Sequence, residues 1–232
     1  MKNTSGADAS SVLGTANVGH LLVQYSLPAI IGTAAASLYN IIDRIIIGHG
    51  VGPMAISGLA LTFPMMNLAA AFGALVGVGS AALVSIRLGQ GRHHEASSIV
   101  GNTVFLNLVL SILFSAVCYA FLDPALYAMG ASPATLPYAR QFMQVILAGN
   151  VCTHLYLGLN SVMRASGYPR KAMFMTLLTV AVNLALAPLY IFVFGWGIRG
   201  AAFATVCAQF VGVVACLLHF FRRDSSVRFE PG

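Results

Sequence analysis

The chain has 232 residues, of which 58% are hydrophobic and only 8% are charged, and its formal net charge is +6. Soluble domains usually carry about 25% charged residues, so this chain has too few charges to form a water-facing surface. The composition excludes an ordinary soluble globular protein and predicts that lipid surrounds most of the chain.

Six apolar runs follow one another along the sequence, each long enough for a membrane-spanning helix, which needs about 20 mostly apolar residues. Short breaks rich in glycine, proline and charge separate them. We therefore expect an all-α membrane protein with six transmembrane helices in residues 21–221, flanked by short polar segments at 1–20 and 222–232. The expected spans are 21–47, 56–84, 99–122, 142–163, 172–194 and 198–221.

The basic residues predict the orientation of these spans, because cytoplasmic loops carry an excess of lysine and arginine. With six spans, one side of the membrane would hold nine basic residues and the other three. Both termini are therefore expected in the cytoplasm, with the chain in the inner membrane. The positive charge needs no nucleic-acid partner to explain it. The nine are Lys2, Arg87, Arg92, Arg164, Arg170, Lys171, Arg222, Arg223 and Arg228, and the three are Arg44, Arg140 and Arg199.

Two adjacent charges interrupt the first apolar run, in the stretch ASLYNIIDRIIIGHG at 35–49. Asp43 is the only acidic residue inside any of the six runs. A charge at the centre of a membrane helix costs about 2.5–3.5 kcal/mol on insertion scales, so such a residue is usually functional. Helical spacing places Tyr39, Asn40 and Asp43 on one face. We interpret Asp43 as a functional carboxylate and Arg44 as a headgroup contact. The alternative is that Asp43 is also a structural residue at the helix end.

Further polar residues lie in the other runs. Each by itself is typical of a hydrogen bond between helices, and together they predict a bundle with a wet interior. Pro28 and Pro64 each remove a helix hydrogen bond and are expected to bend their helices. Gly73 and Gly77 have the spacing that lets two helices approach closely. The polar candidates are Thr62, Asn67, Asn150, His154, Asn160, Asn183, Thr205 and Gln209.

Several motifs together resemble the multidrug and toxic compound extrusion (MATE) family, and most closely its bacterial branch with the DNA-damage-inducible and staphylococcal types. They include SLPAIIG at 26–32, LYNIIDRIIIGHGVG at 38–52, GLALTFPMMN at 58–67, RLGQG at 87–91, LDPALYAMGAS at 122–132, GLNSVMRASGYP at 158–169 and LYIFVFGWGIRGAAFATV at 189–206. The family has twelve helices in two lobes, and the resemblance covers the N-terminal lobe. It implies that residues 222–232 begin an interlobe linker and that a second lobe, or a second chain, completes the substrate pathway.

The resemblance also implies a coupling site. Asp43 matches the first-helix aspartate that takes a proton or helps to bind sodium, with Tyr39, Asn183, Thr205 and Asn160 as its polar partners. Many members carry a second carboxylate one turn after the asparagine, where this chain has Ala187. A single carboxylate is a poorer sodium cage, which favours the proton as the coupling ion.

The remaining candidates are assigned to supporting roles. We expect Asn40, Thr62, Asn67, Asn150, His154 and Gln209 to line the cavity, and Pro28 to act as a hinge. No cofactor is expected, and no metal beyond the coupling ion.

The resemblance implies a secondary active antiporter that exports organic, often cationic, compounds in exchange for H+ or Na+, with substrate selectivity shared with the other lobe. One alternative is a membrane scaffold or regulatory half-protein that transports nothing. An intramembrane hydrolase is disfavoured, because Ser161 and His154 lie seven residues apart on one helix without a GxSxG motif or paired aspartates.

Overall fold

A computed structural model describes residues 18–221 of the chain. Within this range the chain forms eight α-helices and one short π-helical segment, η1. The elements are α2 (Val18–Gly50), α3 (Pro53–Gly89), α4 (His93–Ala120), α5 (Leu122–Ala128), α6 (Leu136–Ala148), α7 (Asn150–Ala165), α8 (Pro169–Pro188), η1 (Leu189–Val193) and α9 (Gly197–Phe221).

Five of the expected spans are single helices, or a helix with its π-helical extension, long and apolar enough to cross a membrane. The fourth differs, because α6 and α7 meet at a bend of 57° and form a broken span. The bend lies at Gly149, whose backbone is pressed against the side chain of Val206 on α9. That close contact leaves no room for a side chain at position 149. The fourth expected span, 142–163, is therefore present as two helices joined at a bend.

The ends of the spans also shift from their expected places. Helix α2 begins at Val18, so residues 18–20 of the expected N-terminal segment 1–20 belong to the first span. The rest of that segment lies outside the described residues. The segment 222–232 lies outside them as well. The third break contains the short helix α5 and the first turn of α6. Both α2 and α3 continue without interruption through Pro28 and Pro64.

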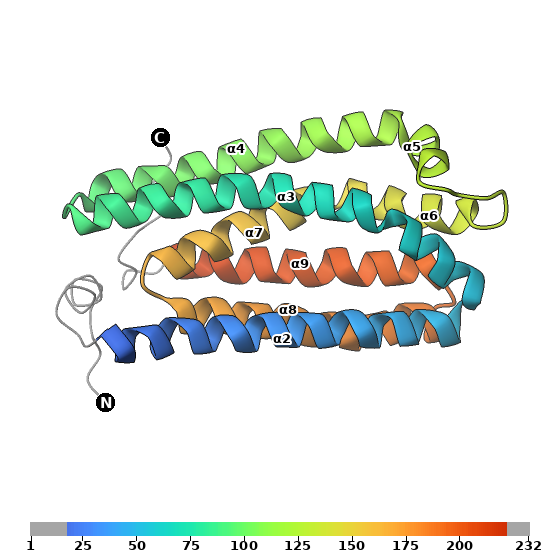
Figure 1. Cartoon of the computed structure of the whole chain (residues 1–232), viewed down its shortest axis with the longest axis horizontal. Helices are drawn as coiled ribbons and strands as arrows, with labels where there is room; N and C mark the ends of the chain where they lie inside the picture. The colour runs from blue at the N-terminus through green and yellow to red at the C-terminus, as the bar shows by residue number, and fades with distance from the viewer. Residues whose placement is uncertain (1–17, 222–232) are drawn as a thin grey trace.

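The helices lie roughly parallel in layers, with α4 on one side, α2 and α8 on the other, and α9 between them (Figure 1). The most extensive helix contact is between α3 and α7, whereas α2 packs mainly against α8. Figure 1 also shows that the start of α2 and the end of α9 lie at the same end of the bundle. This is expected, because an even number of membrane crossings returns the chain to the side from which it started.

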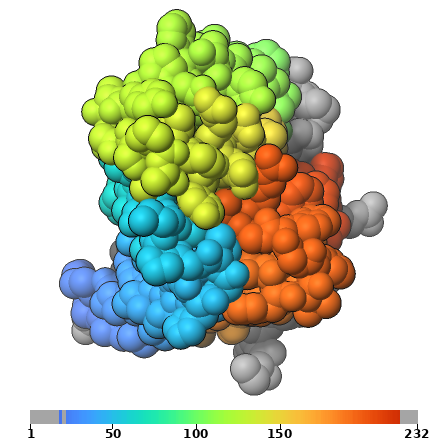
Figure 2. Space-filling view, turned by 90° about the vertical axis from the view of Figure 1, so that its right-hand side faces the viewer, coloured from blue at the N-terminus to red at the C-terminus, as the bar shows by residue number. Residues whose placement is uncertain are grey.

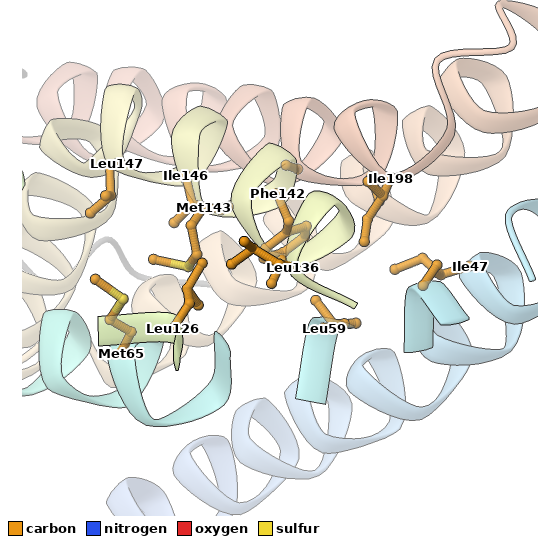
Figure 3. Packing of buried hydrophobic residues seen from close by; sticks show 14 of the residues in the cluster. Ile47, Leu59, Met65, Leu126, Leu136, Phe142, Met143, Ile146, Leu147 and Ile198 are labelled. Atoms are coloured by element: carbon orange, nitrogen blue, oxygen red, sulfur yellow. The ribbon is translucent and has the colours of Figure 1, made fainter. Parts of the chain in front are cut away.

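Two apolar clusters hold the bundle together, one at each end. The first joins α3, α6 and α9 with residues such as Leu59, Phe142 and Ile198 (Figure 3). The second includes Leu159 of α7 and Phe220 of α9. Several polar residues of the long helices lie between these clusters. On α9, for example, the order is Ile198, Thr205, Gln209 and then Val213. The middle of the bundle is therefore a polar band between two apolar ends.

Candidate functional site

Three polar side chains from α2, α8 and α9 meet in the polar band. The Asn183 amide donates from Nδ2 to Thr205 Oγ1 at 3.1 Å. The Tyr39 hydroxyl lies 3.5 Å from the same oxygen. Asn183 is buried, and the other two are half-buried. Thr205 thus accepts hydrogen bonds from both other side chains and links the peripheral helix α2 to α9 at the centre of the bundle.

The directions of these hydrogen bonds follow from the single proton of the threonine hydroxyl. Thr205 Oγ1 donates to the Ala201 carbonyl at 3.2 Å, one turn earlier on α9. Having used its only proton, the hydroxyl acts as acceptor towards both Asn183 and Tyr39. Tyr39 therefore donates, and its phenol oxygen keeps its lone pairs for another partner. The Tyr39 phenol oxygen therefore remains available as an acceptor.

Asp43 lies one turn beyond Tyr39 on α2, close enough to interact electrostatically with Tyr39 and with Arg44. Its Oδ1 atom is buried and has no hydrogen-bond partner among residues 18–221. Asn183 Oδ1 is also buried without a hydrogen-bond partner among these residues. Buried oxygen acceptors without partners are costly, so one carboxylate oxygen and one amide oxygen in this state fit the binding of a cation.

The other acidic side chains of the described range are already paired. Glu95 forms ion pairs with Arg87 at 3.1 Å and with Arg92 at 3.5 Å. Asp123 accepts from Arg140 Nε at 2.7 Å. Asp43 is therefore the only carboxylate within residues 18–221 that makes no ion pair, and it is the one inside the apolar bundle.

Ala187 is the position at which the resemblance implies a second carboxylate in many members. It lies one turn beyond Asn183 on α8 and is completely buried. The site thus contains one carboxylate with hydroxyl and amide oxygens. A proton needs only one basic oxygen, whereas hard metal cations prefer several oxygen ligands, so this donor set fits a proton better than sodium.

Asn160, which the resemblance includes in the coupling site, makes a different contact. It is buried on α7, and its Nδ2 donates to the Ala172 carbonyl of α8 at 3.0 Å. This bond ties α7 to α8 near one end of α8, at its first turn. None of the hydrogen bonds of the Tyr39, Thr205 and Asn183 group includes Asn160.

The cavity candidates fall into two sets. Thr62, Asn150 and His154 are buried, and Asn150 Nδ2 lies 3.4 Å from His154 Nε2. Gln209 is half-buried and accepts a hydrogen bond from Thr153 of α7. By contrast, Asn40 and Asn67 lie on the exposed surface of the bundle. Thr62 donates to the Leu59 carbonyl of its own helix at 2.7 Å.

Sequence reasoning missed a polar stripe on α4. Its residues recur every four positions, which places them on one helix face. Thr103, Asn107 and Ser111 are buried, and the Asn107 amide fills the place where a side chain at Gly158 would lie. The four-residue spacing inside the third apolar run was the signal that could have identified it. The stripe consists of Thr103, Asn107, Ser111 and Ser115.

The family profile described as MatE matches residues 28–189 of the chain, well over half of its length. The chain therefore belongs to the MatE family. This confirms the resemblance drawn from the sequence motifs, and the all-α membrane fold agrees with it.

Particular relatives narrow the comparison. The chain is 26% identical over 209 residues to the multidrug export protein MepA of Staphylococcus haemolyticus (strain JCSC1435), covering 90% of this chain and 46% of that protein. It also matches an outward-facing structure of a multidrug resistance MATE family transporter, with a TM-score of 0.89 and 26% identity over 99% of this chain and 50% of the other. A MATE structure in a bent conformation gives a TM-score of 0.88 at 26% identity, covering 99% and 50% of the two chains. The chain thus spans about half the length of the relatives it matches.

Proposed function

We propose that this chain is one lobe of a proton-coupled antiporter that exports organic, often cationic, compounds, and that Asp43 carries the coupling proton. The observation that supports this most directly is the buried, unpaired Oδ1 of Asp43 beside the network of Tyr39, Thr205 and Asn183. Protonation removes a negative charge from the apolar interior and turns one carboxylate oxygen into a donor. The acceptor Asn183 Oδ1 is a suitable partner for that new donor.

The proposed conformational step follows from how α2 is held. Helix α2 packs on α8 and makes few contacts with α3, so the Tyr39–Thr205 hydrogen bond is one of its few specific links to the bundle centre. A proton on Asp43 would rearrange this link and re-seat α2 against α8 and α9. Pro28 supplies a position without a backbone N–H where α2 can bend.

The partner and the orientation are part of the same proposal. Because the chain covers half of its relatives, a second lobe or a second copy would form the other wall of the substrate path. The nine-to-three distribution of basic residues, and the common end of α2 and α9 in Figure 1, favour both termini on the cytoplasmic side of the inner membrane.

The decisive experiment replaces Asp43 by asparagine, which keeps the shape but cannot titrate. The protein is reconstituted with its complementing lobe, and efflux of a cationic dye from proteoliposomes is measured under a pH gradient and, separately, a sodium gradient. We expect pH-driven efflux by Asp43→Asn to fall to the level without a gradient. The matched control is Arg44→Gln on the neighbouring residue, which should retain most of the activity.

Three outcomes would contradict the proposal. Normal pH-driven efflux by the Asp43→Asn protein would make this carboxylate structural. Efflux by the unsubstituted protein that follows the sodium gradient alone would make sodium the coupling ion. No efflux by the complemented protein under either gradient would favour the scaffold alternative.

A further inference from the structure

Two adjoining hollows lie at the end of the bundle where α6 and α9 begin, the end that faces the viewer in Figure 2. Their volumes are about 330 and 570 Å3, within the range of small-molecule sites. They share Gln141 and Arg199 as lining residues, so they form one groove between the two helices. None of the residues of the Asp43 site lines it.

The first part of the groove is cationic. It is lined by Arg140, Arg199, Gln141 and Gln144. Arg140 uses Nε and Nη2 to bind Asp123 of α5, which fixes its side chain and leaves Nη1 free to donate. Arg199 is exposed in the first turn of α9 and makes no ion pair within the described residues. The groove thus has two guanidinium groups, of which only that of Arg140 is paired with a carboxylate within the described residues, and one positive charge is left unbalanced.

The second part of the groove is aromatic and apolar. Trp196 and Phe203 line it, with Val145 from α6. Trp196 stacks on Tyr190 at 5.3 Å with an interplanar angle of 10° and meets Phe203 edge-on at 5.7 Å. These contacts hold the indole in place, yet it remains 49% exposed. Tryptophan and tyrosine at the end of a span are typical of the level of the lipid headgroups.

We propose that this groove binds an anionic phospholipid, with the phosphodiester between Arg199 and Arg140 and the start of an acyl chain on Trp196 and Phe203. The polar and apolar parts lie side by side, as the two parts of a lipid do. Guanidinium groups suit phosphate because their donors pair with its oxygens in a fork geometry. The two glutamine amides can donate to the ester and glycerol oxygens. The proposal concerns a site separate from Asp43 and does not depend on transport.

The chain carries its own reporter of this site, because Trp196 is its only tryptophan. The full chain is reconstituted in phosphatidylcholine vesicles with increasing fractions of phosphatidylglycerol, and either lipid is brominated on its acyl chains to quench tryptophan fluorescence. A preferred anionic lipid should quench Trp196 at a lower mole fraction than brominated phosphatidylcholine does. We expect an apparent preference of about fivefold, which is typical of one charge-assisted contact.

Arg199→Gln should abolish that preference, so that the two lipids quench about equally, because the substitution removes the unpaired guanidinium. Gln141→Leu, which leaves the Asp123–Arg140 pair intact, should reduce it about twofold and serves as a second, independent variant. Arg170→Gln is the matched control, since it makes the same chemical change at the first turn of α8, away from the groove. It should leave the preference unchanged.

Equal quenching by the two brominated lipids in the unsubstituted chain would overturn the proposal, as would a preference that survives Arg199→Gln. Inorganic phosphate carries a similar anionic group but has no acyl chain. At about 10 mM it should not relieve the quenching of Trp196 by a trace of brominated phosphatidylglycerol. Full relief by phosphate would mean that the groove binds free anions, and the lipid assignment would be wrong.

Discussion

Helices α3 and α7 approach until a Cβ at Gly77 would lie 3.0 Å from the Cα of Gly158, whereas α2 meets the rest of the bundle mainly through α8. The burial of the most apolar part of the span differs accordingly, because 11% of those residues are buried on α2 and 28% on α3. Close backbone contact fixes one side of the bundle. The other side holds the unpaired carboxylate on α2, whose contacts are mainly with the single helix α8.

The difference separates a closely packed part of the lobe from a helix that could shift with little loss of apolar contact. Lipid tails are as apolar as leucine, so an α2 surrounded by lipid loses little when it shifts. Its specific attachment comes from polar contacts such as Tyr39 with Thr205. A group that titrates beside such a contact can move α2 without disturbing α3, α4 and α7.

The largest effect on stability is expected on the close-packed side. Gly77→Ala forces the new methyl group against the backbone of Leu157 and Gly158, at 3.2 and 3.0 Å, and overpacking of this kind costs about 1–3 kcal/mol. Gly79→Ala is the matched control on the same helix, because no atom lies within 4 Å of its added Cβ. There the change should stabilise by up to about 1 kcal/mol, from helix propensity.

Unfolding in detergent, followed by circular dichroism, distinguishes the two glycine variants. Equal stability of Gly77→Ala and Gly79→Ala would show that α3 and α7 are not in close contact in solution. The contrast between the two sides of the bundle would then be lost.

A smaller effect, measured on transport, is expected at Thr205, which attaches α2 to α9. Thr205→Val keeps the shape but removes the acceptor for Asn183 and Tyr39. Net hydrogen bonds contribute about 0.5–1.5 kcal/mol, so proton-driven efflux of the complemented protein should fall about tenfold. Thr205→Ser restores the hydroxyl and should recover most of the rate. Equal rates for the valine and serine variants would exclude the hydroxyl from coupling.

The smallest effect is expected at the turn between α3 and α4. Glu95→Gln breaks two exposed ion pairs, with Arg87 and Arg92, and such pairs are worth about 0.2–1 kcal/mol. The loss should disappear in 0.5 M NaCl, about the concentration at which exposed charges are strongly screened. A destabilisation as large as that of Gly77→Ala would mean that charge at the turn, and not close packing, holds this side together.

Much of this architecture could be read from the sequence, because lipid imposes simple rules. A spanning helix must be long and apolar, so composition alone located the six runs and exposed Asp43 as the one acidic residue within them. The glycines at 73 and 77 predicted a close helix contact, and they pack against His154 and Gly158. These features are local, since each depends on the residues of one helix.

Only the tertiary structure decided which polar residues meet. Asn183 and Thr205 are brought to Tyr39 from helices far along the chain, whereas Asn160 bonds to Ala172, and Asn40 lies on the surface although it follows Tyr39 directly. The close contact at Gly149 was equally hidden, because its partner Val206 lies on another helix. Helical periodicity fixes the face on which a side chain lies. The helix that faces it is set by packing over the whole bundle, which no single run of sequence contains.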